Sequence, residues 1–350
     1  MAAPAIGSDG SRWATALGRT LVMVGALAAS LHARAEAIDR ETQLRLALSV
    51  MKLEVVTPQG YELGSAVLVG PDLLVTNCHV TRRAKAINVL QGGLRHPATA
   101  QASNVVRDLC LVRVPGLDGQ PVAMASAASL QLGQPLLGLG YSGGLGLQFG
   151  QGELVSLHRF DDGRVIRSGN FFTSGASGGG LFDAQGRLVG MLTFRLRGGQ
   201  SHYFSIPADW IESLMNDASR FQPVAPLEGQ AFWEMGTDAP PFLITASLAA
   251  AQQWRELSLI ARQWANDDPR DVGAPLALGN ALEQLGDLAE AESAFAAAVE
   301  MEPDDAFAWL RRGQLQARLG RVDAARATLA RLVQLNALLA EQLAAMPQLQ

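Results

Sequence analysis

The pattern of apolar and polar positions changes character along this chain of 350 residues. Between about residues 60 and 207, short apolar runs alternate with turn signals such as Gly70-Pro71-Asp72. Many short β-type runs with no helical pattern between them are typical of an all-β barrel or sandwich. From Ala246 onward, alanine, leucine, glutamine and arginine dominate with helical spacing. The pattern therefore predicts a multidomain chain, with an all-β part followed by an all-α part.

The segments next to these two parts have less definite patterns. Ile38 to Leu53 is apolar, and its spacing fits either a short helix or a lead-in strand without deciding between them. Residues 221–245 carry prolines and glycines, among them Pro223, Pro226 and Gly229, and are predicted to be a linker.

The helical part, predicted over residues 246–346, has an internal period of 34 residues. Small residues and prolines recur at this interval: Gly279 and Gly313, Gly286 and Gly320, Ala291 and Ala325, and Pro269 and Pro303. This interval is the length of a tetratricopeptide repeat, and the positions resemble that repeat's pattern. We predict two full repeats, at 272–305 and 306–339, after a helix or degenerate half-repeat at 246–268. A stable stack usually needs about three repeats, so the two repeats are expected to be stabilised by contacts with neighbouring parts of the chain.

Residues 1–37 have the pattern of a secretory signal peptide. Arg12 and Arg19 precede an apolar core at 21–29, and small residues at Ala35 and Ala37 fit cleavage after either position. The apolar run is shorter than the roughly 20 residues that span a bilayer. We therefore expect a secreted or periplasmic protein, which would touch a membrane only if the signal stays uncleaved as an anchor.

Composition narrows the function classes. The net charge is -5, only Lys52 and Lys85 are lysines, and aromatic residues do not alternate with basic ones, so we expect no nucleic-acid partner. We also expect no cofactor and no metal ion. The two cysteines, Cys78 and Cys110, suit export to a compartment where disulfides persist.

The glycine-rich stretch Gly175-Ala176-Ser177-Gly178-Gly179-Gly180 is the first candidate for chemistry. A nucleophilic serine needs a neighbouring base, and it needs N–H donors aimed at the developing oxyanion. Glycines permit the positive-φ turn that would aim the N–H groups of Gly175 and Ser177 into one volume. A flexible glycine turn is the alternative. A strand, a turn and a second strand follow instead of a helix, so the base and acid are expected upstream of the serine.

Two upstream residues are suitable partners for Ser177. His79 follows the apolar run Val75-Thr76-Asn77-Cys78, and Asp108 opens another apolar strand. A buried aspartate needs hydrogen-bond donors, and a histidine N–H is a suitable one. Each residue taken alone also fits a structural role, His79 as a histidine after a strand and Asp108 as a turn cap.

Together the three segments resemble the His, Asp and Ser blocks of trypsin-like serine proteases. Their order and spacing, 29 residues from His79 to Asp108 and 69 from Asp108 to Ser177, are most similar to bacterial HtrA/DegP-type members. The segments 190–193 and 204–207 resemble two further blocks of that family. The resemblance covers about residues 50–215. It implies a chymotrypsin-like double β-barrel, which we place at 38–220.

The resemblance also implies a role for each matching residue. Ser177 would be the nucleophile, His79 the general base and Asp108 the residue that orients the imidazole. The N–H groups of Gly175 and Ser177 would form the oxyanion hole. Thr193 matches the position whose hydroxyl supports the buried aspartate, and the segment Thr193-Phe194-Arg195 would pair with an extended substrate.

Two departures from the family pattern have consequences. Ala176 stands where the trypsin branch has an aspartate that pairs with a newly cut N-terminal amine, so activation by propeptide cleavage lacks its electrostatic partner. Arg195 stands where digestive members tend to keep a glycine at the mouth of the specificity pocket. It could narrow the pocket or favour acidic substrates, or it could point to solvent.

The sequence thus predicts an exported serine endopeptidase that cleaves polypeptides through an acyl-enzyme, with repeats that recruit substrate or a protein partner. The alternative is a catalytically inactive binding or scaffold protein on a protease fold. Since the helical part offers no histidine and no glycine loop, a chain ending near Gln222 is expected still to cleave a small peptide.

A disulfide between Cys78 and Cys110 is expected from the same arrangement. Cys78 immediately precedes His79, and Cys110 lies two residues after Asp108, on the same strand face. If His79 reaches Asp108, the two cysteine backbones must lie close to one another. Two small buried thiols packed together remain the alternative.

Overall fold

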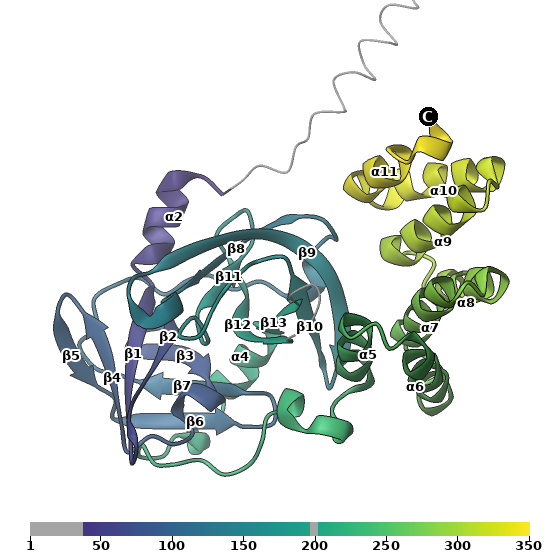
Figure 1. Cartoon of the computed structure of the whole chain (residues 1–350). Coiled ribbons are helices and arrows are strands. Elements are labelled where there is room, and N and C mark those ends of the chain that lie inside the picture. Colours follow the sequence, from purple (N-terminus) through teal and green to yellow (C-terminus); the bar gives the residue numbers. More distant parts are fainter. Residues whose placement is uncertain (1–37, 197–201) are drawn as a thin grey trace, which may run out of the picture. The chain divides into compact units, whose positions relative to one another are not determined.

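The computed structural model describes residues 38–196 and 202–350 of the chain (Figure 1). The signal peptide predicted at residues 1–37 lies outside the described residues and stays a prediction. Residues 38–350 form one compact unit. Within the described ranges, no helix is both long and apolar enough to cross a membrane.

The first β lobe is a seven-stranded antiparallel sheet. Its strands are β1 (Val50–Thr57), β2 (Gly60–Gly70), β3 (Leu73–Asn77), β4 (Ala86–Gln91), β5 (Leu94–Pro97), β6 (Ala100–Asn104) and β7 (Leu109–Arg113). Their order across the sheet is β5-β4-β1-β2-β3-β7-β6. The pairing of β3 with β7 brings together the two segments that carry His79 and Asp108.

The segment between Ile38 and Leu53 contains both of the elements that the sequence left open. Helix α2 (Arg40–Ala47) begins after Asp39, whose carboxylate accepts a hydrogen bond from the N–H of Thr42. Such a cap satisfies one of the free N–H groups of the first helical turn. The chain then enters β1 at Val50.

The second β lobe is a closed barrel with the strand order β10-β13-β12-β11-β8-β9. Its strands are β8 (Pro135–Gly140), β9 (Gln148–Phe160), β10 (Gly163–Ser168), β11 (Gly180–Phe182), β12 (Leu188–Leu196) and β13 (His202–Pro207). A short helix, α4 (Asp209–Met215), follows the barrel.

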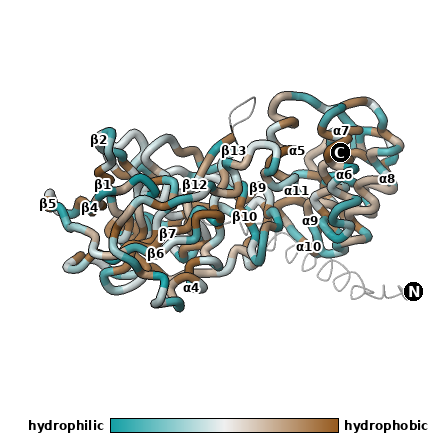
Figure 2. Tube along the Cα trace, turned by 90° about the horizontal axis from the view of Figure 1, so that it is seen from below, coloured by the Kyte–Doolittle hydropathy of each residue, from teal (hydrophilic) through white to brown (hydrophobic). Residues whose placement is uncertain are grey.

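Each lobe has an apolar interior. One cluster fills the first lobe and includes Leu53, Leu74 and Val112, and another fills the barrel and includes Leu181 and Val189. Figure 2 shows apolar segments along the strands of the β lobes and hydrophilic segments mainly along their outer turns. The burial of alternating strand positions, which removes apolar surface from water, drives the folding of both lobes.

The helical part consists of antiparallel neighbours joined by short turns. Its helices are α5 (Pro241–Ala250), α6 (Trp254–Asp267), α7 (Gly273–Leu285), α8 (Leu288–Met301), α9 (Ala306–Arg318), α10 (Val322–Leu335) and α11 (Ala337–Ala344). The pairs α7/α8 and α9/α10 coincide with the two predicted repeats. A Cβ atom at Gly279 would lie 2.6 Å from the ring of Phe295, so glycine is needed where α7 and α8 pack closely. The prediction of a β part followed by helical repeats is confirmed.

The start of the helical part differs from the sequence prediction in one respect. Helix α5 begins at Pro241, inside the predicted linker 221–245, and residues 246–268 hold the end of α5 and all of α6. The chain turns between these helices at Gln252, which has a positive φ of 57°. Pro241 occupies the first helical turn, where its missing N–H costs nothing.

Candidate active site

Strand pairing brings His79 and Asp108 together. Strand β3 ends at Asn77, which pairs with Leu109 of β7, and His79 lies in the short helix α3 (Cys78–Thr81) directly after it. Asp108 precedes β7 in a left-handed conformation, with φ of 57°. Aspartate is among the few residues that tolerate this conformation. The two side chains therefore meet at the same end of neighbouring strands.

The carboxylate of Asp108 contacts both the ring and the backbone of His79. The His79 ring nitrogen Nδ1 lies 2.7 Å from Oδ2 of Asp108, and the His79 backbone N–H donates to Oδ1 at 2.7 Å. The carboxylate is completely buried, while the imidazole is 20% exposed. A buried carboxylate that accepts from Nδ1–H fixes the tautomer in which Nε2 is an acceptor. This arrangement suits His79 as a general base.

The loop of Ser177 is shaped by glycines and tied to the first lobe. Gly175 and Gly178 have positive φ values of 95° and 85°. A Cβ atom at Gly178 would lie 2.1 Å from the carbonyl oxygen of Ser65, so no other residue fits there. The Ser65 N–H donates to the carbonyl of Ser177, and its hydroxyl donates to that of Gly175 at 2.8 Å.

The loop leaves two backbone donors free. Among the described residues, the N–H groups of Gly175 and Ser177 have no hydrogen-bond acceptor, whereas those of Ala176, Gly178 and Gly179 each have one. Free N–H groups two positions apart, on either side of Ala176, are the kind of donors that an oxyanion hole requires.

The hydroxyl of Ser177 has a different partner from the expected one. It donates to the backbone carbonyl of Thr193 at 3.1 Å, and no hydrogen bond joins it to His79 in the part of the chain that the structure describes. Catalytic hydrogen bonds are often incomplete without substrate. The structure thus brings His79 and Asp108 into contact, and it gives the Ser177 hydroxyl a different partner.

Thr193 does not support Asp108 as the resemblance implied. Its hydroxyl donates to the carbonyl of Met191 at 2.7 Å and accepts from the Nδ2 of Asn77 and the N–H of Ile206. Asn77 in turn donates to the backbone carbonyl of Asp108, at 3.1 Å. The proton of the Thr193 hydroxyl goes to Met191 in β12, so this hydroxyl does not donate to the Asp108 carboxylate. Thr193 is linked to the backbone of Asp108 through Asn77.

Among the described residues, no strand pairs with one side of the segment Thr193-Phe194-Arg195. Strand β12 pairs with β13 along this segment, whereas its pairing with β11 ends at Met191. An extended peptide could add to the free side by main-chain hydrogen bonds. The side chain of Phe194 is buried, and Arg195 is exposed, which agrees with the option that Arg195 points to solvent.

Comparisons with known proteins agree with this geometry. Residues 64–191 match the model of the trypsin-like peptidase domain. This part of the chain is a trypsin-like peptidase domain. Residues 276–339 match the model of the tetratricopeptide repeat.

Similar individual proteins share only part of their length with this chain. An uncharacterized protein of Sinorhizobium fredii, y4bJ, is 34% identical over 157 residues, which are 40% of this chain and 24% of y4bJ. The HtrA-type protease AlgW with tripeptide is 25% identical over 50% of this chain and 61% of its own, with a TM-score of 0.47. The protease Rv3671c of M. tuberculosis, in its active form, is 21% identical over 56% of this chain and 92% of the Rv3671c chain, with a TM-score of 0.47. The chain spans less than two thirds of y4bJ and of AlgW.

The cysteines of the peptidase domain form the expected disulfide. Cys78 and Cys110 are bonded, with their Cα atoms 4.9 Å apart, and both are completely buried. The bond joins the residue before His79 to the strand that begins after Asp108. It therefore holds together the two segments that carry the histidine and the aspartate.

A residue from the predicted linker also reaches the site, and no sequence pattern predicted it. The indole Nε1–H of Trp233 donates to Oδ2 of Asp108 at 3.0 Å. Its ring meets the His79 ring edge-on, with 5.4 Å between the centroids, and stacks on Phe194 at 4.9 Å. Asp108 thus has three N–H donors, two from His79 and one from Trp233.

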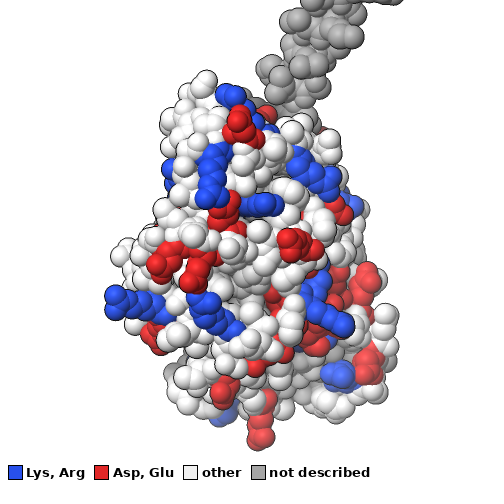
Figure 3. All heavy atoms as spheres, turned by 90° about the vertical axis from the view of Figure 1, so that its right-hand side faces the viewer, with Lys and Arg blue, Asp and Glu red and all other residues white. Residues whose placement is uncertain are grey.

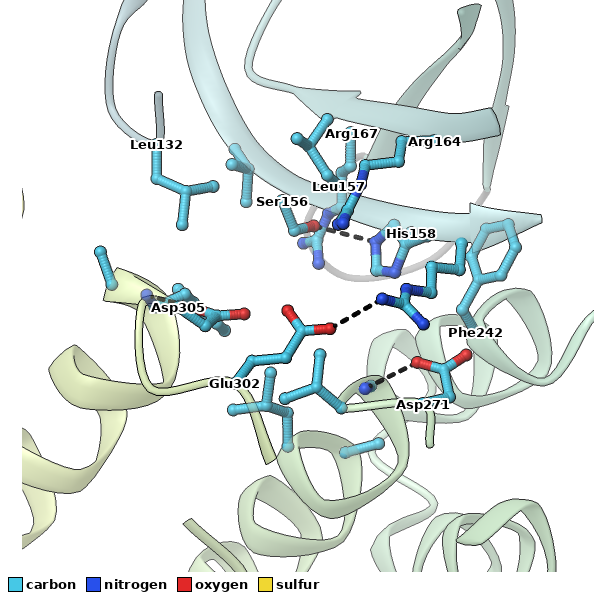
Figure 4. A pocket seen from close by; sticks show the side chains of 18 of the residues that line it. Leu132, Ser156, Leu157, His158, Arg164, Arg167, Phe242, Asp271, Glu302 and Asp305 are labelled. Atoms are coloured by element: carbon cyan, nitrogen blue, oxygen red, sulfur yellow. Dashed lines mark hydrogen bonds and ion pairs between the residues drawn. The ribbon is translucent and has the colours of Figure 1, made fainter. Parts of the chain in front are cut away.

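A separate pocket of about 610 Å³ is lined by residues of β9, β10 and the helical part (Figure 4). Arg159 and Glu302 form an ion pair across it at 3.2 Å. His158 lines one wall, where its ring stacks on Phe242 at 4.6 Å and bonds to the hydroxyl of Ser156. None of its lining residues is His79, Asp108 or Ser177.

His158 should make the protein less stable in acid. Burial, with help from Arg167 and His202, lowers the pKa of His158 to about 3 from an ordinary 6.5. Between these values the unfolded chain binds a proton that the folded chain excludes, so stability is complete above pH 6.5 and is lost as the pH falls. The full shift would lower the free energy of unfolding by about 2 kcal/mol at pH 5. Because the His158 side chain is only partly buried, we expect a loss of about 1 kcal/mol.

Urea unfolding at pH 7.5 and pH 5 tests this expectation. His158→Gln should lose about 1 kcal/mol less than the wild type between the two pH values. At pH 7.5 His158 of the wild type is neutral. The difference in unfolding free energy between the two proteins at this pH therefore measures the loss of the Phe242 stack alone, and it serves as the control. Equal pH dependence in both proteins would contradict the assignment to His158.

Proposed function

We propose that this protein is an exported serine endopeptidase that uses His79, Asp108 and Ser177. The observation that carries the proposal is the hydrogen bond from the His79 ring to a completely buried Asp108. Burying a carboxylate is costly unless it accepts hydrogen bonds, and those of Asp108 orient the imidazole of His79. The N–H groups of Gly175 and Ser177, which have no acceptor among the described residues, supply the oxyanion donors that such a mechanism needs.

The proposed reaction follows from these contacts. When a peptide lies along Thr193-Phe194-Arg195, Ser177 turns from the Thr193 carbonyl to Nε2 of His79. His79 takes the hydroxyl proton as Ser177 Oγ attacks the scissile carbonyl, and Asp108 stabilises the imidazolium. The N–H groups of Gly175 and Ser177 hold the oxyanion. His79 then protonates the leaving amine, and water releases the acyl group by the same route.

A non-catalytic binding protein is the second candidate, and one observation favours it. The Ser177 hydroxyl donates to Thr193 rather than to His79, so the serine is not activated in the arrangement described. A protease fold that only binds peptides would keep the open strand edge and would not need the serine to turn.

Labelling with a fluorophosphonate probe separates the two candidates. Wild-type protein should be labelled at Ser177, because the probe reacts only with an activated serine. Ser177→Ala should show no labelling, while Ser129→Ala, which removes an exposed hydroxyl elsewhere, should be labelled like the wild type. Well-folded wild-type protein that stays unlabelled would favour the binding protein.

The remaining parts of the proposal concern export and partners. The disulfide and the signal-like pattern of residues 1–37 support export, and the mass of the exported protein should correspond to cleavage after Ala35 or Ala37. The tetratricopeptide repeats support a role in recruiting the polypeptide substrate or a protein partner. On the face in Figure 3, basic and acidic side chains are interspersed, as suits contacts with protein.

A further inference from the structure

The predicted linker is attached to the peptidase domain beside the catalytic candidates. Gln222 and Gln101 exchange two backbone hydrogen bonds. Further on, the N–H of Leu227 donates to the carbonyl of Arg82, three residues after His79. The N–H of Phe232 donates to the carbonyl of Val106, two residues before Asp108. The chain from Gln222 to Phe232 therefore lies along the segments that carry His79 and Asp108.

Two side chains fix the short turn Phe232–Glu234 in place. Phe232 is completely buried, and its ring stacks on Phe160 with 4.4 Å between the centroids. Glu234 accepts two hydrogen bonds from the guanidinium of Arg82, at 2.5 and 2.8 Å. Paired bonds of this kind define an orientation as well as a contact. The residue between these anchors, Trp233, therefore has little freedom to leave the site.

We propose that Trp233 is a positioning residue of the peptidase, which keeps the Asp108 carboxylate oriented toward the His79 ring. This inference rests on the proposed peptidase function and deepens it. Oδ2 of Asp108 accepts from both Nδ1 of His79 and Nε1 of Trp233. The indole N–H thus supplies, from the linker, the side-chain donor that the resemblance had assigned to Thr193.

The physical reason lies in the burial of Asp108. Burying a carboxylate is costly unless it accepts hydrogen bonds, and each hydrogen bond to a charged group is strong. Without the indole, Oδ2 would depend on His79 alone and could rotate away from it. The stack of Trp233 on Phe194 keeps the indole N–H aimed at Oδ2, and Phe194 is itself supported by Phe204 at 5.0 Å.

Trp233→Phe in the full-length protein tests the inference. Phenylalanine keeps an aromatic ring against Phe194 and His79 but removes the N–H donor. On a small peptide substrate, we expect kcat to fall about tenfold or more with little change in KM. Trp309→Phe is the matched control, because it removes an indole N–H that donates to the carbonyl of Pro303, in the repeats. It should leave both constants unchanged.

Proton NMR gives a second measurement that does not require activity. In the wild type, the Nδ1 proton of His79 should appear far downfield, as expected for a short bond to a buried carboxylate. It should move or broaden in Trp233→Phe and stay unchanged in Trp309→Phe. If Trp233→Phe does not fold, the indole N–H signal of Trp233 can be followed in Asp108→Asn, where it should shift while that of Trp309 does not.

The outcomes distinguish this inference from the proposed function. An unlabelled wild type would overturn the peptidase, and the NMR signals would still decide whether Trp233 holds Asp108. An active wild type with unchanged kcat and an unchanged His79 signal in Trp233→Phe would overturn the positioning role alone. Higher activity in Trp233→Phe would also overturn it, because the ring would then obstruct the site.

Discussion

Asp108→Asn is expected to lower kcat about 10⁴-fold while the protein stays folded. An amide at this position can donate to Nδ1 of His79, which stabilises the wrong tautomer and leaves no acceptor for the serine proton. The amide also cannot stabilise the imidazolium that forms during attack. Asparagine has nearly the same shape as aspartate, so the variant fills the site and loses the charge, and an Nδ2 placed at Nδ1 of His79 no longer accepts from Trp233.

Steady-state kinetics on a peptide substrate measures this effect. Asp72→Asn is a matched control, because Asp72 also has a positive φ, of 56°, and its carboxylate accepts one backbone N–H, that of Gly116. We expect its kcat to be within about twofold of the wild type. If Asp108→Asn retained more than a tenth of wild-type kcat, the proposed role of Asp108 would be wrong.

The β lobes and the pair His79 and Asp108 could be predicted because their signals are local. Each residue borders an apolar run, and the antiparallel pairing of such runs brings their ends together. The glycines around Ser177 were informative for a similar reason, since the positive φ values of Gly175 and Gly178 are a property of the residue type. The 34-residue period likewise marked the repeats before any contact was known.

Trp233 could not be predicted, because its role depends on a partner 125 residues earlier in the chain. The linker has prolines and glycines but no periodicity, and such a composition indicates only irregular structure. The start of α5 was hidden by Pro240-Pro241, which indicated a linker although proline also begins helices. The hydroxyl of Thr193 was misjudged because sequence cannot show which of several near acceptors it reaches.

The contacts of Trp233 also change what is expected of a truncated chain. From the sequence, a chain ending near Gln222 should still cleave a small peptide. The structure changes this expectation: that chain would lack the indole donor to Asp108 and the Glu234 partner of Arg82, so its kcat should be well below that of the full-length protein. The linker therefore belongs with the peptidase domain in any dissection of the protein.

Removing the disulfide should cause the largest loss of stability among the changes considered. Cys78 and Cys110 are separated by 32 residues, and closing a loop of this length stabilises the folded state by about 3 to 4 kcal/mol in the chain-entropy estimate. In Cys78→Ala/Cys110→Ala, the unfolded chain regains that freedom. Urea unfolding of the double variant should show this loss, and wild-type protein treated with a reductant should lose a similar amount.

The disulfide should also influence the site that it adjoins. The N–H of Cys78 donates to the backbone carbonyl of Asp108 at 3.2 Å, so the bond and the His79–Asp108 contact share the same backbone. Alkylation of the denatured, exported protein before and after reduction, followed by mass spectrometry, establishes the bond directly. No alkylated cysteine before reduction and two after it are expected. Two alkylated cysteines without reduction would show that the thiols are only packed together, and the stability difference should then be much smaller than 3 kcal/mol.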